Sequence, residues 1–386
     1  MRVTFKSLPS PVDWVLYVRV TPLRDVHVEL GASFGEFAGW EVPMVYTSTV
    51  EEHMAVRGGV GVFDISHMGR LVLSGSHVLD LIELVYTKRV SRTKVGFMSG
   101  PTLALNNYAR VKDDEMLYNI DGERWFLVPN AAVADAMESY LKNVAESHGF
   151  KVEVWNLRDE YAMLAIQGPR AVEVMEKLGA SWANSLKPLE FRVGERIAGV
   201  ETFIVSRSGW TGEDGFEIIA KPGAAEVILR ESIRAGAKPA GIAARDTLRI
   251  EMGFVLGGFE YGEDPLKFPC AYSLRYGMGA IDWSKRGFIG EEALRACRRE
   301  GARWVRVGLI MRKEAARVIP RHGYKVYVED MEVGWVTSGT YSPVLGRGIA
   351  QAYIDSRYAL IGESVEVEVR GSRYEARITD FPFIKR

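Results

Sequence analysis

Apolar positions three or four residues apart predict several helices. The clearest begins after Asn130, a residue type that favours helix N-caps, and ends near Gly149. Its apolar positions are Val133, Met137, Tyr140, Leu141 and Val144. Ser48 and Glu51 match a capping box for a short helix that ends at Gly58. Two more helices are expected, one after Pro169 that ends near Gly179 and one over 224–235.

Short alternating runs between these helices predict isolated strands. Leu71–Leu73 and Glu201–Ser206 have this pattern. Strands and helices do not follow a strict strand–helix–strand repeat, so the first three hundred residues fit an α+β arrangement.

From about residue 300 onward the pattern changes to short strands alone. The expected strands are Arg303–Met311, Tyr324–Glu329 and Gly348–Ile354. Alternating residues on either side of Gly371 and Ser372 predict a β-hairpin. The C-terminal part is therefore expected to be a separate all-β domain.

Composition narrows the class of protein. The 386 residues carry 49 basic and 50 acidic side chains, a formal net charge of −1, which argues against a dedicated nucleic-acid binder. No apolar run approaches the length of a membrane span. The six histidines form no metal-binding motif, so no metal site is expected. Cys270 and Cys297 have no CxxC spacing, which indicates a reducing compartment and predicts a cytoplasmic location.

Asp113, Asp114 and Glu115 form an acidic run between apolar segments. Such a run is typical of a solvated turn, and the residues alone favour that interpretation. The alternative is that one carboxylate lies in a cleft, where its neighbours would shift its pKa and suit it to hold a cation or share a proton. The segment 64–69, DISHMG, is interpreted as a capped turn with a hydrogen-bonded histidine.

The segment 206–217, SRSGWTGEDGFE, combines three glycines, an aromatic residue and three acids between two strand-like runs. It is either an ordinary bulged hairpin or a turn that lets a flat heterocycle lie against the backbone, with a carboxylate pairing two adjacent N–H donors. The helix predicted from Gly241 places Arg245 and Arg249 on one face. They suit an anionic group, or a local ion pair with Asp246.

Taken together, the segments of this chain resemble the aminomethyltransferase family, the T-protein of the glycine cleavage system. The resemblance runs from about His27 to the C-terminus, with the order of its motifs kept. The motifs are FAGWEVPMVY, EEHMAVRGGVGVFDISHMG, AIQGPRA, SRSGWTGEDGFE, AARDTLRIEMG, FIGEEAL and VTSGTYSPVLG.

The resemblance implies a three-domain clover-leaf fold of the α+β class around a tetrahydrofolate site. It divides the chain into an N-terminal extension (1–26), a split folate-binding first domain (27–55 and 155–285), an inserted second domain (56–154) and a C-terminal β-barrel (286–386). The implied reaction takes an aminomethyl group from the dihydrolipoyl arm of the H-protein, releases ammonia and forms 5,10-methylenetetrahydrofolate. Tetrahydrofolate is then a co-substrate, the other glycine cleavage components are partners, and no metal, nucleic acid or membrane is involved.

The resemblance also assigns roles to individual residues. It implies that Glu217 binds the pterin edge and that Arg245 lines the folate site. The catalytic carboxylate is expected from the acidic pair, with Asp114 as first candidate and Asp113 as second. The remaining residues implied to line the folate site are Met68, Trp210 and Asn130.

The chain departs from the family pattern near the implied substrate side. It has no Gly-Gly turn before the acidic pair, Trp210 replaces the usual tyrosine, and Leu256–Glu260 replaces an LYGQD-type segment. Two alternatives therefore stay open. One is another folate-dependent one-carbon transferase or demethylase on the same fold, and the other is a non-catalytic folate-binding regulatory protein.

Overall fold

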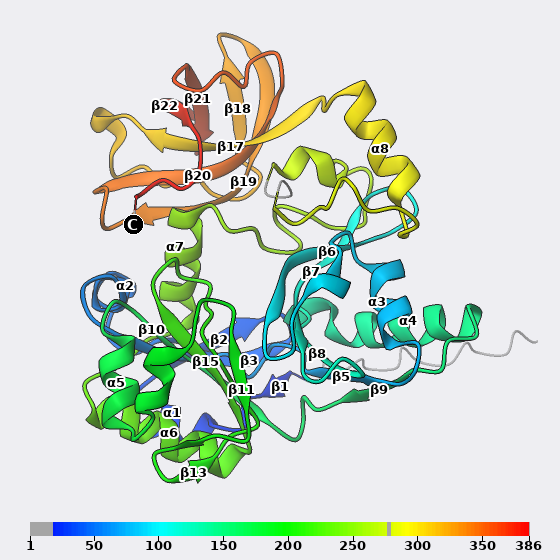
Figure 1. Cartoon of the computed structure of the whole chain (residues 1–386). Coiled ribbons are helices and arrows are strands. Elements are labelled where there is room, and N and C mark those ends of the chain that lie inside the picture. Colours follow the sequence, from blue (N-terminus) through cyan, green and yellow to red (C-terminus); the bar gives the residue numbers. More distant parts are fainter. Residues whose placement is uncertain (1–17, 276–278, 386) are drawn as a thin grey trace, which may run out of the picture.

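The structure is a computed structural model that describes residues 18–275 and 279–385. Figure 1 shows three lobes, built around a six-stranded sheet, a five-stranded sheet and a C-terminal barrel. The expected N-terminal extension lies mostly outside the described residues. Its last part forms β1 (Arg19–Val20), which joins β2 (Ser33–Phe37) and β3 (Trp40–Val45) in a small sheet beside α1 (Arg24–Glu29).

The six-stranded sheet is covered on both faces. Its strand order is β11 (Phe191–Val193), β14 (Ile204–Ser206), β15 (Gly215–Ala220), β10 (Ala162–Gln167), β4 (Gly61–Asp64) and β16 (Lys238–Pro239). Helices α5 (Ala171–Lys177) and α6 (Pro222–Arg234) bury one face in an apolar cluster. On the other face, α2 (Thr49–Gly58) and α7 (Ile242–Met252) pack in a cluster that also includes the five-stranded sheet. Later in the sequence than the 3-10 turn Ser181–Ser185, the strands β12 (Arg196–Ile197) and β13 (Val200–Glu201) form a separate two-stranded hairpin.

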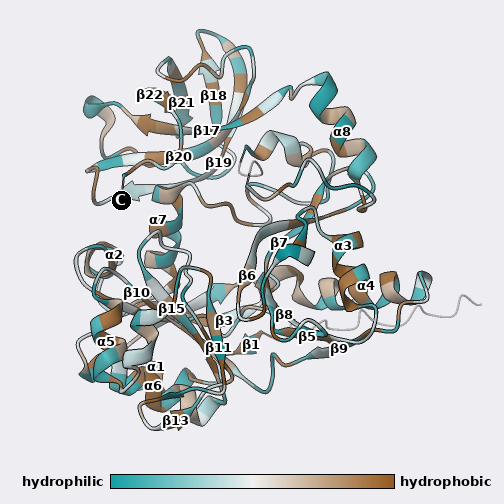
Figure 2. Ribbon diagram, in the orientation of Figure 1, coloured by the Kyte–Doolittle hydropathy of each residue, from teal (hydrophilic) through white to brown (hydrophobic). Residues whose placement is uncertain are grey.

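The five-stranded sheet has the order β6 (Met98–Leu105), β7 (Val111–Asn119), β8 (Arg124–Leu127), β5 (Leu71–Ser74) and β9 (Glu153–Asn156). Helices α3 (Val78–Val85) and α4 (Ala134–Ser147) pack on it. Figure 2 shows the hydrophobic character of α3, in contrast to the hydrophilic α8 (Glu291–Glu300). Short 3-10 turns occupy Val90–Arg92 and Ala131–Val133.

The C-terminal strands close into a barrel, as the pattern after residue 300 predicts. Its order is β17 (Trp304–Met311), β20 (Arg347–Asp355), β19 (Met331–Ser342), β18 (Lys325–Val328), β21 (Ser364–Val369) and β22 (Ser372–Thr379). The hairpin loop is Arg370–Gly371, one residue earlier than predicted, because Ser372 already pairs with Val369. Two 3-10 turns, Ala271–Leu274 and Lys313–Ala315, lie before and within the barrel segment.

The α+β class and the all-β C-terminal part are confirmed. The capping box is also confirmed, since the Ser48 side chain accepts a hydrogen bond from the Glu51 amide. The division into domains stays a prediction. However, β4 pairs with β10, which favours a first segment of the split domain that extends to Asp64 rather than residue 55. No helix in the described part of the chain combines the length and apolar character needed to cross a membrane.

A buried ionic network fastens α2, α7 and the barrel together. The Glu251 carboxylate on α7 receives Arg57 of α2 at 2.9 and 3.0 Å and lies 3.1 Å from the His53 ring nitrogen. Ser342 at the end of β19 also donates to it. Burial opposes ionisation of Glu251, but His53, Ser342 and Arg57 outweigh that effect and lower its pKa.

We expect Glu251→Ala to lower the free energy of unfolding by about 3–5 kcal/mol, because it leaves the Arg57 guanidinium buried without this partner. Chemical denaturation at pH 7 measures the change. Since the pKa of Glu251 is depressed in the folded protein, its contribution is present at neutral pH and is lost as the pH falls through that value, so the difference from wild type should shrink in acid.

Glu173→Ala is the matched control, because Glu173 lies in the first turn of α5 and forms an exposed ion pair with Arg170. The denaturation midpoint of the Glu173→Ala protein should stay close to that of the wild type. A Glu251→Ala protein as stable as this control would contradict a structural role for the network.

Candidate active site

The acidic run lies on a buried strand, not in a solvated turn. Asp113, Asp114 and Glu115 belong to β7, which pairs with β6 on one side and β8 on the other. Side chains alternate along a strand, so Asp113 and Glu115 share one fully buried face, while Asp114 is half-buried on the other. The interpretation favoured by the residues alone is therefore wrong, because neighbouring strands and packed residues cover this polar run.

Two neutral side chains bring the carboxylates of Asp113 and Asp114 together. The Asn130 side-chain amide donates to Asp113 at 2.8 Å and to Asp114 at 3.0 Å, and its backbone N–H donates to Asp113 at 2.9 Å. The Tyr261 hydroxyl donates to Asp114 and lies 3.2 Å from Asp113. Asn130 therefore binds the acidic pair. Asn130 is the N-cap residue of the 3-10 turn Ala131–Val133 that leads into α4, as predicted, but its side chain makes no capping hydrogen bond.

Burial raises the pKa values of the two acids by different amounts, so their protonation states differ at pH 7. Burial, followed by the charge of Asp114, raises the pKa of Asp113 to about 8. Burial also raises the pKa of Asp114, to about 6, against the opposing hydrogen bonds from Tyr261 and Asn130. At pH 7 the pair therefore holds one proton, on Asp113, and Asp114 carries the negative charge.

A second polar cluster forms where β15 and the segment 206–215 meet α7. The buried Glu217 carboxylate receives the Ser208 hydroxyl at 2.6 Å and lies 4.0 Å from the Arg245 guanidinium. The Arg245 guanidinium lies over the Trp210 ring, 5.3 Å from its centroid, and Arg249 lies 5.8 Å from the same centroid. Asp246 pairs with Arg249, at 2.8 Å.

Arg245 and His67 leave buried polar atoms without hydrogen-bond partners in the described part of the chain. These atoms are Nη1 of Arg245 and Nδ1 of His67. Burial, followed by the charge of Arg245, lowers the pKa of His67 to about 3, so its ring is neutral. Buried donors and acceptors are normally paired, and these two are suited to a polar ligand.

The interpretation of 64–69 is correct for the turn. The Ser66 backbone N–H donates to Asp64 at 2.9 Å, and Asp64 also lies 2.8 Å from the His27 ring. The expectation that the histidine of this turn is fully hydrogen-bonded is wrong, because Nδ1 of His67 has no hydrogen-bond partner among the described residues.

Met68 and Tyr118 connect the two clusters. Met68 is half-buried against the apolar cluster shared by the two sheets, and the next residue, Gly69, bonds Pro129 at 2.8 Å, directly before Asn130. Tyr118 lies four residues after Asp114 on β7, and its hydroxyl reaches Ser206 at 3.4 Å. Ser206 in turn bonds Ser208, the partner of Glu217, at 2.8 Å. The predicted site residues thus fall into two adjacent clusters at one junction of the sheets.

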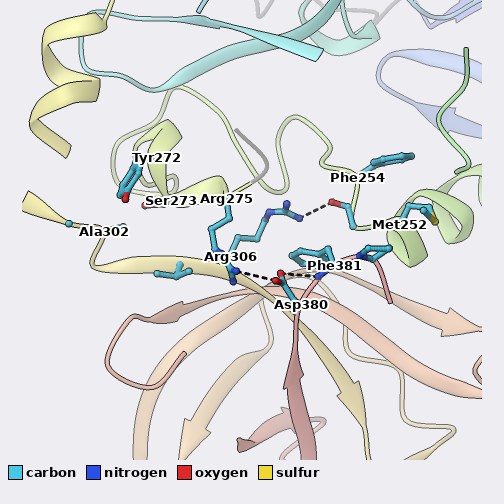
Figure 3. A pocket seen from close by; sticks show the side chains of 13 residues that line it. Met252, Phe254, Tyr272, Ser273, Arg275, Ala302, Arg306, Asp380 and Phe381 are labelled. Carbon is cyan, nitrogen blue, oxygen red and sulfur yellow. Dashed lines mark hydrogen bonds and ion pairs between the residues drawn. The ribbon is translucent and has the colours of Figure 1, made fainter. Parts of the chain in front are cut away.

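A hollow of about 780 Å³ lies elsewhere, between the end of α7, the barrel and the C-terminal segment. Figure 3 shows Arg275 and Asp380 in its wall, 3.3 Å apart. Its lining includes none of the predicted site residues. The described residues also contain no group of three or more His, Cys, Asp or Glu that could hold a metal ion.

Comparison with known proteins decides the family. Residues 23–269 match the model of the GCVT N-terminal domain, and residues 305–385 match that of the glycine cleavage T-protein C-terminal barrel domain. The chain belongs to the glycine cleavage T-protein family. A probable aminomethyltransferase of Aeropyrum pernix is 66% identical over 95% of this chain and 98% of its own length.

More distant members give the same result. An aminomethyltransferase of Thermus thermophilus is 38% identical over 95% of this chain and 99% of its own length. The crystal structure of a glycine cleavage system aminomethyltransferase T from Bartonella henselae superposes with a TM-score of 0.86, at 29% identity, over 95% of this chain and 98% of that one. The T-protein fold predicted from the resemblance is confirmed, and the chain is an enzyme of the aminomethyltransferase class.

Sequence reasoning did not single out Tyr261 or Ser208 as site residues. Ser208 lies inside the glycine-rich motif 206–217, so the motif itself pointed to it. Tyr261 follows the segment in which the chain departs from the family pattern, and nothing local in the sequence marks it as a partner of β7.

Proposed function

We propose that this T-protein family member transfers the aminomethyl group of a dihydrolipoyl carrier, the H-protein, to tetrahydrofolate with release of ammonia. The observation that carries the proposal is the pair of clusters at one junction. Arg245 and Glu217 offer charged groups for recognition, and the Asp113–Asp114 pair offers one ionised carboxylate held by neutral donors.

The recognition role falls to the cluster on β15 and α7. A carboxylate binds two adjacent N–H donors in a planar, bidentate manner, and the pterin edge of a folate has such donors. Glu217 is held by Ser208, and Trp210 supplies a flat wall under Arg245. The unpartnered nitrogens of Arg245 and His67 remain available for further polar groups of the ligand. Met68 and Asn130 complete the proposed folate-lining set.

The catalytic role falls to Asp114. Transfer of a one-carbon group from an amine develops positive charge on the reacting atoms, and a preorganised carboxylate stabilises that charge. Asp114 is ionised at pH 7, is half-buried and is fixed by Tyr261 and Asn130. Asp113 keeps the proton and contributes no second negative charge.

The proposed partners are the lipoyl-bearing H-protein, the other glycine cleavage components and folate. A cytoplasmic location remains a prediction based on two free cysteines. The alternative donor, an N-methylated amine, is favoured only by the changes in sequence at Trp210 and 256–260, which lie near the implied substrate side.

One assay tests the reaction. The protein is incubated with aminomethyl-loaded lipoyl carrier and tetrahydrofolate, and ammonia and methylenetetrahydrofolate are measured. Both products should form in equal amounts and only when carrier and folate are present together. Product from a small N-methylated amine, with none from the carrier, would support the demethylase alternative instead. No turnover with either donor would contradict the proposal.

Asp114→Asn is expected to lower kcat by about 10²–10³-fold, because it removes the charge that stabilises the transition state. The dissociation constant for tetrahydrofolate should change little. Steady-state kinetics and equilibrium binding separate the two effects, with Asp121→Asn in the exposed turn after β7 as the control. Equal losses in turnover and affinity would make Asp114 a binding residue.

Glu217→Ala is expected to weaken tetrahydrofolate binding by roughly 2–3 kcal/mol, because a charge-assisted hydrogen-bonding partner is lost. Titration calorimetry measures the affinity directly. Glu201→Ala, at an exposed position of β13, is the matched control and should bind folate as the wild type does. Unchanged affinity in Glu217→Ala would remove this residue from the folate site.

A further inference from the structure

Tyr261 reaches the acidic pair from a distant part of the chain. It follows α7 in sequence, and its side chain is 3% exposed. Its hydroxyl donates to Asp114 and lies 3.3 Å from the Asp114 backbone N–H and from the Asn130 amide nitrogen. One oxygen atom thus contacts three of the groups that define the pair.

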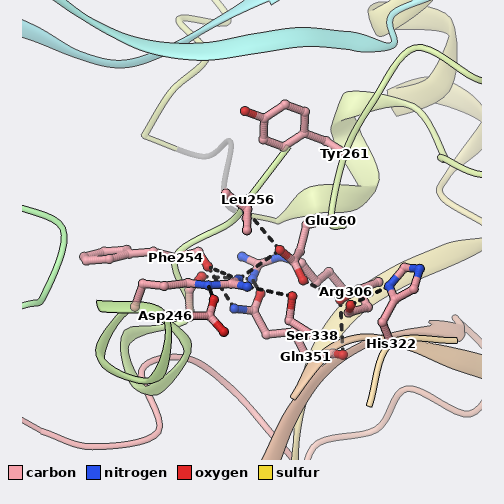
Figure 4. A network of polar contacts seen from close by, with 12 residues as sticks. Asp246, Phe254, Leu256, Glu260, Tyr261, Arg306, His322, Ser338 and Gln351 are labelled. Atoms are coloured by element: carbon pink, nitrogen blue, oxygen red, sulfur yellow. Dashed lines mark hydrogen bonds and ion pairs between the residues drawn. The ribbon is translucent and has the colours of Figure 1, made fainter. Parts of the chain in front are cut away.

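The segment that carries Tyr261 is bonded to both α7 and the barrel. The preceding residue, Glu260, is fully buried; its carboxylate receives Arg249 of α7 at 3.0 Å and Thr337 of β19 at 2.6 Å. The Tyr353 hydroxyl of β20 donates to the Glu260 carbonyl at 2.8 Å. Figure 4 shows this network, with the Tyr261 ring extending away from it.

Gly257 makes room for the Tyr261 ring. A Cβ atom at this glycine would lie 3.2 Å from the Tyr261 hydroxyl oxygen and 3.3 Å from its ring carbons. The neighbouring Gly258 N–H also donates to the Tyr261 carbonyl at 2.7 Å. The chain therefore fixes both the backbone and the ring of Tyr261 next to β7.

We propose that Tyr261 is a positioning residue that orients Asp114 and keeps its carboxylate ionised for the transfer reaction. This inference rests on the function proposed above. A hydrogen bond to the charged form of an acid favours that form. Burial, followed by the charges of Asp114 and Asp113, raises the pKa of Tyr261, so its hydroxyl stays protonated and remains a donor.

The charged group that acts most on the pKa of Asp114 is an acid, Glu260, and two further acids lie beside Asp114 on the same strand. On β7 these are Asp113 and Glu115, and Glu260 faces it from the segment after α7. Tyr86, at the end of α3, donates to Glu115 at 2.9 Å. Tyr261 and Asn130 therefore supply the hydrogen bonds that offset burial at Asp114, and loss of the Tyr261 hydroxyl should favour protonation.

Tyr261→Phe tests the proposal, because it removes one oxygen and keeps the ring. We expect the acidic limb of the kcat/KM profile to move to higher pH by about one pH unit, with KM for folate little changed. Tyr374→Phe, at a half-buried position of β22 against the barrel core, loses the same atom elsewhere and is the control with an unchanged profile.

A second measurement needs no substrate. Carboxyl ¹³C NMR of aspartate-labelled protein follows the titration of Asp114 directly, assigned with Asp114→Asn. Its midpoint should move upward in Tyr261→Phe. The contrary outcome is a Tyr261→Phe protein that loses kcat and thermal stability together while the acidic limb of its pH profile and the NMR midpoint of Asp114 stay where they are in the wild type. That result would overturn the proposal and leave Tyr261 with a packing role only.

The two hypotheses fail differently. A wild-type protein without transfer activity would contradict the proposed function, and the NMR titration would still decide whether Tyr261 controls the ionisation of Asp114. An active wild type with an unshifted Tyr261→Phe profile would contradict the positioning role alone.

Discussion

The placement of two adjacent carboxylates inside a sheet is the constraint on which the site depends. Ionising both Asp113 and Asp114 away from water would be costly, so one proton must stay and the other acid needs donors. Those donors come from Asn130 before α4 and Tyr261 after α7. The segments that carry Asn130 and Tyr261 are far apart in the chain. Both must therefore pack against β7 before Asp113 can stay protonated while Asp114 is ionised.

Helix α7 makes that meeting possible because it links the six-stranded sheet and α2 to the barrel and to the segment that carries Tyr261. Arg245 faces Glu217 and Trp210 on the six-stranded sheet side. Arg249, one turn later, holds Glu260 and thereby the segment that carries Tyr261. Glu251 fastens the same helix to α2 and to the end of β19. Charged residues are buried along one helix, and each has a partner from a different element.

The sequence predicted most of the elements but only part of the site. Local signals were sufficient for the capping box at Ser48 and for the barrel hairpin, where residue spacing alone sets the structure. They failed at Asp113–Glu115, because a run of acids looks solvated unless the strands that cover it are known. At Asn130 they gave the N-cap position correctly but missed the role of the side chain, whose amide makes no capping hydrogen bond and binds the acidic pair instead. Tyr261 depends wholly on tertiary contacts.

The surroundings of Glu217 and Asp114 explain why different tasks are proposed for them. Glu217 lies beside the Arg245 cation and Ser208, so its charge is already partly balanced and it suits recognition of a polar edge. Asp114 is held by neutral donors, and the charge that acts on its pKa is that of another acid, Glu260. Its negative charge is therefore not balanced by any cation bonded to it among the described residues. That imbalance favours a positively charged group beside Asp114, which is the electrostatic requirement of one-carbon transfer from an amine.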